Sequence, residues 1–315
     1  MQKKWCLFQA TDFQTLMYPC FTLCSILGLF PYKINNSIFK ASKSRYILSI
    51  TFICASCIFQ VTFSYIVQLT YMYLFAKQEN FEFITMYLET ISYYILLDSL
   101  LIATLLSSRS RMRLLQTITR ISSKLSPKIY QKLSRLIHAK DIIGFFCTIS
   151  VTAMYFYGKP TDISNMIYSM YSSLVIFQLD MMYVNCVCVL KACFKEINDK
   201  LLHMQELVVN NESRVLTMQR YPFLTMKLKT LKKQHIIISN TIHMLNTTFS
   251  FQLVVSIILT FIIITFDLYD NLVQWHKNEL VITLDQVSDM FLSSILKQDI
   301  SRMSRVATDL IRICQ

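Results

Sequence analysis

The chain has 315 residues, of which 54% are hydrophobic, 16% are charged and only 3 are glycine, and its mean hydropathy is +0.42. A soluble domain carries about 25% charged residues and could not bury this much apolar surface, so the composition excludes an ordinary soluble protein and predicts an all-α polytopic membrane protein. The formal net charge of +12 is expected in cytoplasmic loops, because no long basic run with interleaved aromatic residues points to nucleic acid.

The first candidate element covers residues 13–32, which carry no charge. Pro19 and Pro31 interrupt it, and serine and threonine residues dilute it, so we expect a short interfacial or re-entrant helix. A full span and a cleaved signal peptide are alternatives, although no A-x-A-like site follows. Residues 1–45 as a whole should form a cytoplasmic N-terminal segment.

Five segments are long and apolar enough to cross a membrane as helices. The last of them, MLNTTFSFQLVVSIILTFIIITF, has 23 residues without a charge, and a helix of this length covers a hydrocarbon core of about 30 Å. Short turns should join the first span to the second and the third span to the fourth. The five spans cover residues 46–76, 81–106, 142–158, 163–190 and 244–266.

Two longer connectors between the spans are basic. Residues 107–141 should be largely helical with a break at Pro127, because proline ends a helix that precedes it. Residues 191–243 should form two helical extensions with a loop near residues 210–213. Spans and connectors together make residues 46–276 a transmembrane bundle.

The C-terminal part of the chain gives a weaker signal. Residues 280–296 are a marginal sixth span, since they carry Asp285 and Asp289 one helical turn apart on the same face. We treat residues 277–315 as a divergent C-terminal segment.

Lysine and arginine are distributed unevenly among the loops. Residues 1–45 hold six, and residues 107–141 and 191–243 hold nine each, whereas the intervening turns hold three in total. The positive-inside rule therefore places the N-terminus and both long connectors in the cytoplasm. Four further cations near the C-terminus would obey the rule only if residues 280–296 cross, so this crossing stays open.

Motifs of catalysis and of metal binding are not evident. The sequence has no G-x-S-x-G, no Walker lysine loop and no H-E-x-x-H, so we expect neither enzymatic activity nor a cofactor. The ten cysteines are scattered, and the C-x₂-C of Cys54 and Cys57 lacks a second pair or a nearby pair of histidines. We therefore expect most cysteines to be reduced, small, buried side chains.

Acidic residues inside the predicted spans are the informative polar features. Glu89, Asp98 and Asp180 would be costly in hydrocarbon, so they should face the interior of the bundle or water. They would either line a polar ligand pocket or an ion path, or only hydrogen-bond between helices.

Tyrosines gather near Glu89 in the halves of the second to fourth spans that the predicted orientation places outside, whereas Asp180 lies in the other half of the fourth span. A cavity lined by tyrosines and a carboxylate would suit a small polyol or an aromatic amine, although tyrosine is also an ordinary membrane-interface residue. The candidate ligand-binding residues are Tyr87, Glu89, Tyr93, Tyr94, Asp98, Tyr155, Tyr168 and Tyr171.

Two stretches resemble the insect gustatory receptors. The first, FQTLMYPCFTLCSILGLFPYK, places two prolines ahead of the first span. The second, LKKQHIIISNTIHMLNTTFSFQLVVSIILTFIIITFDLYDNLVQW, resembles the long helix that rises from the cytoplasm and becomes the fifth span in that family. The resemblance covers about residues 10–276 and looks closest to the fructose-type, broadly tuned branch.

The resemblance implies a seven-helix receptor with a cytoplasmic N-terminus in the plasma membrane of sensory neurons. It also implies a homo- or hetero-tetramer in which a small sugar-like or bitter tastant opens a cation pore. In that family the seventh helix lines the pore and carries a TY…QF signature. The chain has no such signature and no apolar seventh span after residue 266, so we expect the last helix to be missing, truncated or divergent.

Several alternatives to a conducting taste receptor remain. One is a non-conducting, truncated receptor, and another is an insect odorant receptor, which shares the topology. A G-protein-coupled receptor would need an external N-terminus, against the charge distribution. A small transporter would show inverted repeats or paired helices broken by glycine or proline, which are not evident here.

Overall fold

A computed structural model of the chain describes most of the sequence. It describes residues 8–35, 38–75, 81–156, 163–209 and 220–276. The elements in it are α1 (Phe13–Ile26), β1 (Tyr32–Asn35), β2 (Ile38–Ala41), α2 (Lys43–Phe75), α3 (Phe81–Leu106), α4 (Ser108–Ser122), α5 (Pro127–Phe156), α6 (Ile163–Val209) and α7 (Arg220–His276).

The helices confirm an all-α polytopic membrane protein. Within the described ranges, four helices (α2, α5, α6 and α7) are long and apolar enough to cross a membrane. A fifth candidate is the pair of α3 and α4, which are bent by 61° at the break between them. The predicted second span has the same bounds as α3, and the break predicted at Pro127 is confirmed, because α5 begins there.

The long helices continue well beyond the predicted spans. Helix α6 includes the fourth predicted span and runs on to Val209, and α7 starts at Arg220, ahead of the fifth. This confirms the two helical extensions in the second connector. The loop predicted near residues 210–213 and the marginal span at residues 280–296 lie outside the described residues.

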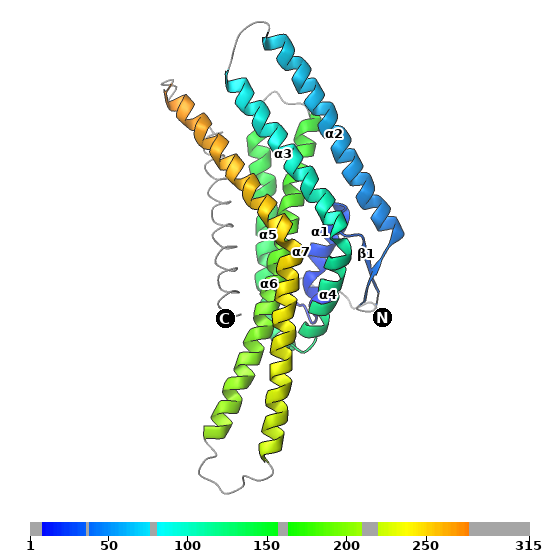
Figure 1. Cartoon of the computed structure of the whole chain (residues 1–315), viewed down its shortest axis with the longest axis vertical. Helices are drawn as coiled ribbons and strands as arrows, with labels where there is room; N and C mark the ends of the chain where they lie inside the picture. Colours follow the sequence, from blue (N-terminus) through cyan, green and yellow to red (C-terminus); the bar gives the residue numbers. More distant parts are fainter. Residues whose placement is uncertain (1–7, 36–37, 76–80, 157–162, 210–219, 277–315) are drawn as a thin grey trace.

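Helices α6 and α7 form the long axis of the molecule (Figure 1). They pack against each other, and their extensions project together below the rest of the bundle. Helix α5 packs along α6, α3 packs on α7, and α2 packs on α3 at the edge of the bundle. Short α1 and α4 lie at mid-height, where both contact α6.

Helix α1 is a short helix packed inside the bundle. A capping box starts it, in which the Thr15 amide donates to Asp12 Oδ1 over 2.9 Å and the Asp12 amide donates to Thr15 Oγ1 over 3.1 Å. Its 14 residues extend only about 21 Å, short of a 30 Å hydrocarbon core. A short helix is therefore confirmed within residues 13–32, while its re-entrant or interfacial placement stays a prediction.

A small antiparallel hairpin between α1 and α2 was not predicted from the sequence. Its two strands pair Lys33 with Lys40 and Tyr32 with Ala41. The Tyr32 hydroxyl donates to the Ser108 carbonyl, which ties the hairpin to α4. Burial raises the pKa of this phenol well above its ordinary value, so it keeps the proton that it donates.

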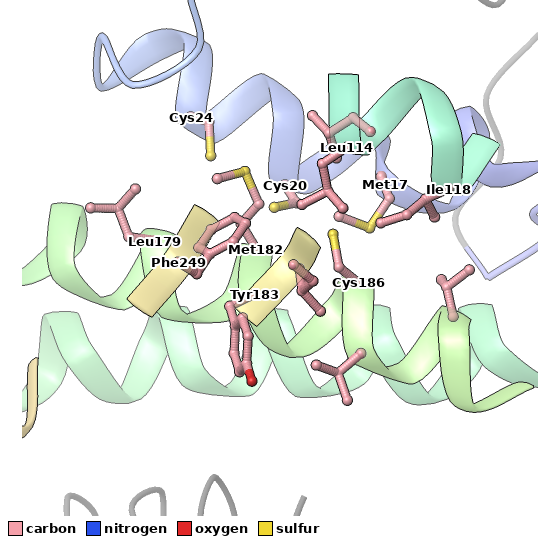
Figure 2. Close-up of a cluster of buried hydrophobic side chains, with 14 of the residues drawn as sticks. Met17, Cys20, Cys24, Leu114, Ile118, Leu179, Met182, Tyr183, Cys186 and Phe249 are labelled. Carbon is pink, nitrogen blue, oxygen red and sulfur yellow. The ribbon is translucent and has the colours of Figure 1, made fainter. Parts of the chain in front are cut away.

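A cluster of buried hydrophobic side chains lies where α1, α4, α6 and α7 meet (Figure 2). Its side chains are aliphatic, aromatic or sulfur-containing, and they fill the space between the helices. Its three cysteines are buried, but only four of the eight cysteines that the structure describes are, so the expectation that most cysteines are buried holds for half of them. We call this region the sulfur-rich core, and it contains Met17, Cys20, Cys24, Leu114, Ile118, Leu179, Met182, Tyr183, Cys186 and Phe249.

Candidate functional site

Five of the eight residues predicted to bind a ligand lie together. Tyr93, Tyr94 and Asp98 come from α3, whereas Tyr168 and Tyr171 come from α6. The rings of Tyr94 and Tyr168 meet edge to face with 5.6 Å between centroids, and those of Tyr168 and Tyr171 are 6.5 Å apart. Both separations are typical of favourable aromatic pairs, so residues far apart in the sequence form one cluster.

The remaining three predicted residues are Tyr87, Glu89 and Tyr155. Tyr87 and Glu89 belong to α3 and Tyr155 belongs to α5, but their side chains lie outside the described residues. Their participation in a site stays a prediction.

Helix α2 supplies a second aromatic wall. Phe59 stacks on Tyr168 with 4.3 Å between ring centroids, and Phe63 meets the ring of Tyr94 edge to face at 5.7 Å. These rings occupy the space between α2, α3 and α6. We call the group the aromatic cluster, and it consists of Phe52, Phe59, Phe63, Tyr93, Tyr94, Tyr168 and Tyr171.

A chain of hydrogen bonds runs through the aromatic cluster. The Ser56 hydroxyl donates to Asp98 Oδ1 over 3.3 Å and lies 3.0 Å from the Tyr168 hydroxyl oxygen. Since Ser56 has a single proton, Tyr168 must donate to Ser56, which leaves its own oxygen free to accept from the Gln60 amide. The network joins three helices, and Ser56, Gln60 and Tyr168 are all buried.

The α2 residues of the site share one helical face. Phe52, Ser56, Phe59, Gln60 and Phe63 stand at positions i, i+4, i+7, i+8 and i+11. They are not among the predicted site residues, because the charge-free span reads as uniformly apolar. The signal was present, because this periodicity distinguishes a face of aromatic and polar side chains within the helix.

Two further hydroxyls fix the cluster to its surroundings. Tyr93 donates to Ser172 Oγ over 3.1 Å, and Tyr171 donates over 3.4 Å to the Leu27 carbonyl at the end of α1. The Tyr171 ring also stacks on Phe52 at 5.8 Å. A cavity of about 10 Å³, room for about one water molecule, adjoins this stacked pair.

The chemistry of the cluster suits a small ligand with both a ring-like face and polar groups. Aromatic rings offer stacking surfaces, and the Ser56, Gln60 and Tyr168 groups offer donors and acceptors. The half-buried Asp98 carboxyl adds a further acceptor. When this carboxyl is ionised, the hydrogen bonds that it accepts are stronger than those accepted by a neutral group.

Asp180 belongs to a separate network nearer the middle of α6. Its Oδ1 accepts hydrogen bonds from Gln252 Nε2 and Ser256 Oγ of α7, both over 3.2 Å. The Gln252 carbonyl oxygen accepts in turn from Arg111 Nη2 of α4 over 3.1 Å, and the same nitrogen donates to Thr104 over 3.3 Å. Asp180 therefore forms hydrogen bonds between helices, which is one of the two roles predicted for the intramembrane acids.

Arg111 is a cation inside the protein, with only 3% of its surface exposed. Its guanidinium lies over the Phe249 ring at 4.8 Å, a cation–π contact. Its Nε and Nη1 atoms are buried without a hydrogen-bond partner in the described structure. Gln252 thus bridges this guanidinium and the Asp180 carboxylate by hydrogen bonds.

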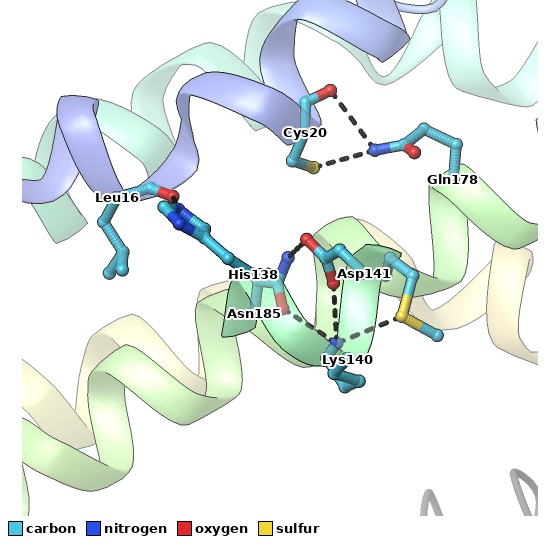
Figure 3. A network of polar contacts seen from close by, with 8 residues as sticks. Leu16, Cys20, His138, Lys140, Asp141, Gln178 and Asn185 are labelled. Atoms are coloured by element: carbon cyan, nitrogen blue, oxygen red, sulfur yellow. Dashed lines mark hydrogen bonds and ion pairs between the residues drawn. The ribbon is translucent and has the colours of Figure 1, made fainter. Parts of the chain in front are cut away.

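A further polar network joins α5 to α6 (Figure 3). Lys140 Nζ donates to Asn185 Oδ1 over 2.8 Å and lies 3.2 Å from Asp141 Oδ1. The Asn185 amide donates to Asp141 Oδ2 over 2.8 Å and closes the set. Because each of these groups has a partner, the network is best understood as a link between the two helices.

Helix α1 is held against α5 and α6 by side-chain to backbone contacts. His138 Nε2 lies 2.9 Å from the Leu16 carbonyl oxygen, and Gln178 Nε2 donates to the Cys20 carbonyl over 3.2 Å. A cavity of about 110 Å³ lies between α1 and α5, with mostly apolar walls. Within the described ranges, no group of three or more His, Cys, Asp or Glu side chains is arranged to hold a metal ion.

The chain is similar over most of its length to one family of known proteins. The model of a family described as 7tm Chemosensory receptor matches residues 17–297. This region includes all of α2, α3 and α6, the helices that form the aromatic cluster. No curated protein matches the chain.

Proposed function

The chain belongs to the 7tm chemosensory receptor family, and we propose that it is a gustatory receptor subunit that binds its tastant at the aromatic cluster. Membership of a chemosensory family confirms the sequence resemblance at the level of the family. The gustatory assignment and the fructose-type branch go further and rest on the two stretches that resemble the insect gustatory receptors.

One observation carries the choice of site. The ring of Tyr168 stacks on Phe59 while its hydroxyl hydrogen-bonds to Ser56 and Gln60, close to Asp98. A sugar-like ligand would stack on the same rings and exchange its hydroxyls for these hydrogen bonds. An aromatic amine would stack similarly and pair its ammonium with the Asp98 carboxylate.

Ligand-gated cation permeation is the proposed mechanism. Helix α7 packs against both α3 and α6, which carry the cluster, so a shift of either helix reaches α7 directly. The Arg111–Gln252–Asp180 relay also links α7 to α4 and α6.

The tetramer, homomeric or heteromeric, and its central pore are proposed from the family resemblance. So are the plasma-membrane location and the cytoplasmic N-terminus, which the distribution of cations also supports.

An odorant receptor is the second candidate. The number of phenylalanine rings on the α2 wall favours it, because a volatile aromatic compound would need stacking surface more than hydrogen bonds. The two candidates differ in how strongly the response should depend on Asp98.

The test is a dose–response measurement of ligand-evoked current in cells that express the chain with candidate partner subunits. The panel contains sugars, aromatic amines, bitter compounds and volatile aromatics. Asp98→Asn should raise the half-maximal concentration of a polar tastant about 10- to 100-fold, as expected when a hydrogen bond to a charged group is lost. Asp199→Asn is the matched control, because Asp199 is exposed on the α6 extension.

The outcomes separate the candidates. A shift with Asp98→Asn at unchanged surface expression, and none with Asp199→Asn, supports the tastant site. A response to volatile aromatics alone that ignores Asp98→Asn but is weakened by Phe59→Leu supports the odorant alternative. If neither Asp98→Asn nor Tyr168→Phe alters any response, the cluster is not the ligand site.

A further inference from the structure

The hairpin and α4 present a basic surface outside the site described above. The two strands carry exposed lysines on one side, and α4 carries exposed arginines. At the lower end of α2 in Figure 1 the hairpin lies beside α4. We call this surface the hairpin patch, and its exposed cations are Lys33, Lys40, Lys43, Arg109, Arg113 and Arg120.

The hairpin patch is held in place by contacts beneath it. Phe39 is buried, and its carbonyl accepts a hydrogen bond of 2.8 Å from Gln116 Nε2 of α4. Arg113 precedes Gln116 by three residues and Arg120 follows it by four, so all three lie on one face of α4. The arginines therefore flank the point where the hairpin docks.

The positive charge of the patch has no acidic partner within its own elements. Lys33 and Lys40 are directly opposite each other in the ladder, an arrangement that destabilises a hairpin when both charges are alike. The sequence contains no acidic residue between Asp12 and Glu79, and none between Asp98 and Asp141. A bound anion would remove the repulsion that the fold leaves in place.

The patch lies at the level where a membrane surface is expected. Helix α2 begins at Lys43, and within two turns it exposes Ile47 and Ile50, whose side chains suit hydrocarbon. The change from lysine to exposed isoleucine marks the boundary between lipid headgroups and acyl chains. Lys33 and Lys40 precede this boundary in the chain, on the headgroup side.

We propose that the hairpin patch binds the anionic headgroup of a phospholipid in the adjacent leaflet. The phosphate sits between the paired lysines of the hairpin and the arginines of α4, so it connects the start of α2 to the bend between α3 and α4. In the proposed orientation this is the cytoplasmic leaflet, where anionic lipids concentrate. The proposal needs no assumption about which ligand the aromatic cluster takes.

The test measures binding of a fluorescent, short-chain phosphatidylinositol phosphate to the full chain in phosphatidylcholine nanodiscs. Lys33→Gln/Lys40→Gln should weaken binding about 30-fold, because each cation near an anionic lipid surface contributes about fivefold. Lys229→Gln/Lys232→Gln is the matched control, since it removes the same charge from exposed positions on the α7 extension. Lys33→Arg/Lys40→Arg should retain binding.

A second measurement separates lipid binding from a structural role of the two lysines. In pure phosphatidylcholine the Lys33→Gln/Lys40→Gln variant should unfold at the same temperature as the natural protein or higher, because a repulsion is removed. Addition of the anionic lipid should raise the unfolding temperature of the natural protein but not that of the variant.

Three results would overturn the proposal. One is equal loss of affinity in the hairpin variant and in the α7 control, which would mean a nonspecific charge effect. Another is a lower unfolding temperature of the hairpin variant in pure phosphatidylcholine with no lipid-dependent difference. The third is binding of soluble inositol phosphate as tight as that of the lipid, which would identify a free anion as the occupant.

Discussion

The aromatic cluster and the sulfur-rich core are both buried between helices, yet they are built differently. In the sulfur-rich core, leucine, methionine and cysteine side chains fill the space, and they lose their contacts if they move apart. In the aromatic cluster, rings and hydroxyls span the space between α2, α3 and α6, and each hydroxyl has partners that a ligand can replace. The sulfur-rich core is thus suited to holding the helices in fixed positions, whereas the aromatic cluster is suited to exchanging its own hydrogen bonds for those of a ligand.

The largest expected effect on stability comes from a substitution in the sulfur-rich core. Leu114→Ala in the sulfur-rich core should lower the free energy of unfolding by about 2–5 kcal/mol, because the fully buried side chain leaves a cavity. Thermal or denaturant unfolding in nanodiscs measures it. Leu106→Ala is the matched control, since 79% of Leu106 is exposed at the end of α3, and it should change little. Equal effects at the two positions would contradict a packed core at α4.

The next effect concerns the Arg111–Gln252–Asp180 network, which belongs to neither region. Gln252→Leu should lower the free energy of unfolding by about 1–3 kcal/mol, because Arg111 and Asp180 both lose a buried partner. If the relay couples α7 to the ligand site, maximal ligand-evoked current should fall as well. Gln234→Leu, on the α7 extension, should affect neither unfolding nor current.

The smallest stability effect belongs to the aromatic cluster. Tyr168→Phe should lower the free energy of unfolding by about 1 kcal/mol, because the ring stays stacked while the hydroxyl is lost. Ligand dose–response curves should nevertheless shift, whereas Tyr183→Phe in the sulfur-rich core should leave them unchanged. A response that depends on Tyr183 but not on Tyr168 would reverse the roles assigned to the two regions.

Hydropathy and charge were sufficient to predict the helical spans, because the membrane imposes length and apolarity on each segment locally. The convergence of Tyr94, Asp98 and Tyr168 corresponds to one of the two alternatives that the sequence left open for these tyrosines and acids. Ser56 and Gln60 were not identified, although their helical spacing with Phe59 was visible. The hairpin was missed because its strands have four residues each, too short for a clear alternation of polar and apolar side chains.

The burial of Arg111 could not be predicted from its neighbours in the sequence. It stands in a basic stretch that reads as a solvated connector. Its burial depends on Phe249 and Gln252 of α7, about 140 residues later, and thus on the packing of α4 against α7. Hydrophobic periodicity describes each helix separately and carries no information about such a long-range partner.

The uninterrupted length of α7 has a mechanical consequence. At about 1.5 Å per residue, the 32 positions from Gln252 down to Arg220 form a rigid arm of about 48 Å. A tilt of about 5° at Gln252 would therefore displace the far end of the arm by about 4 Å. Displacements too small to disturb the core around Gln252 would thus become large at the other end of the protein.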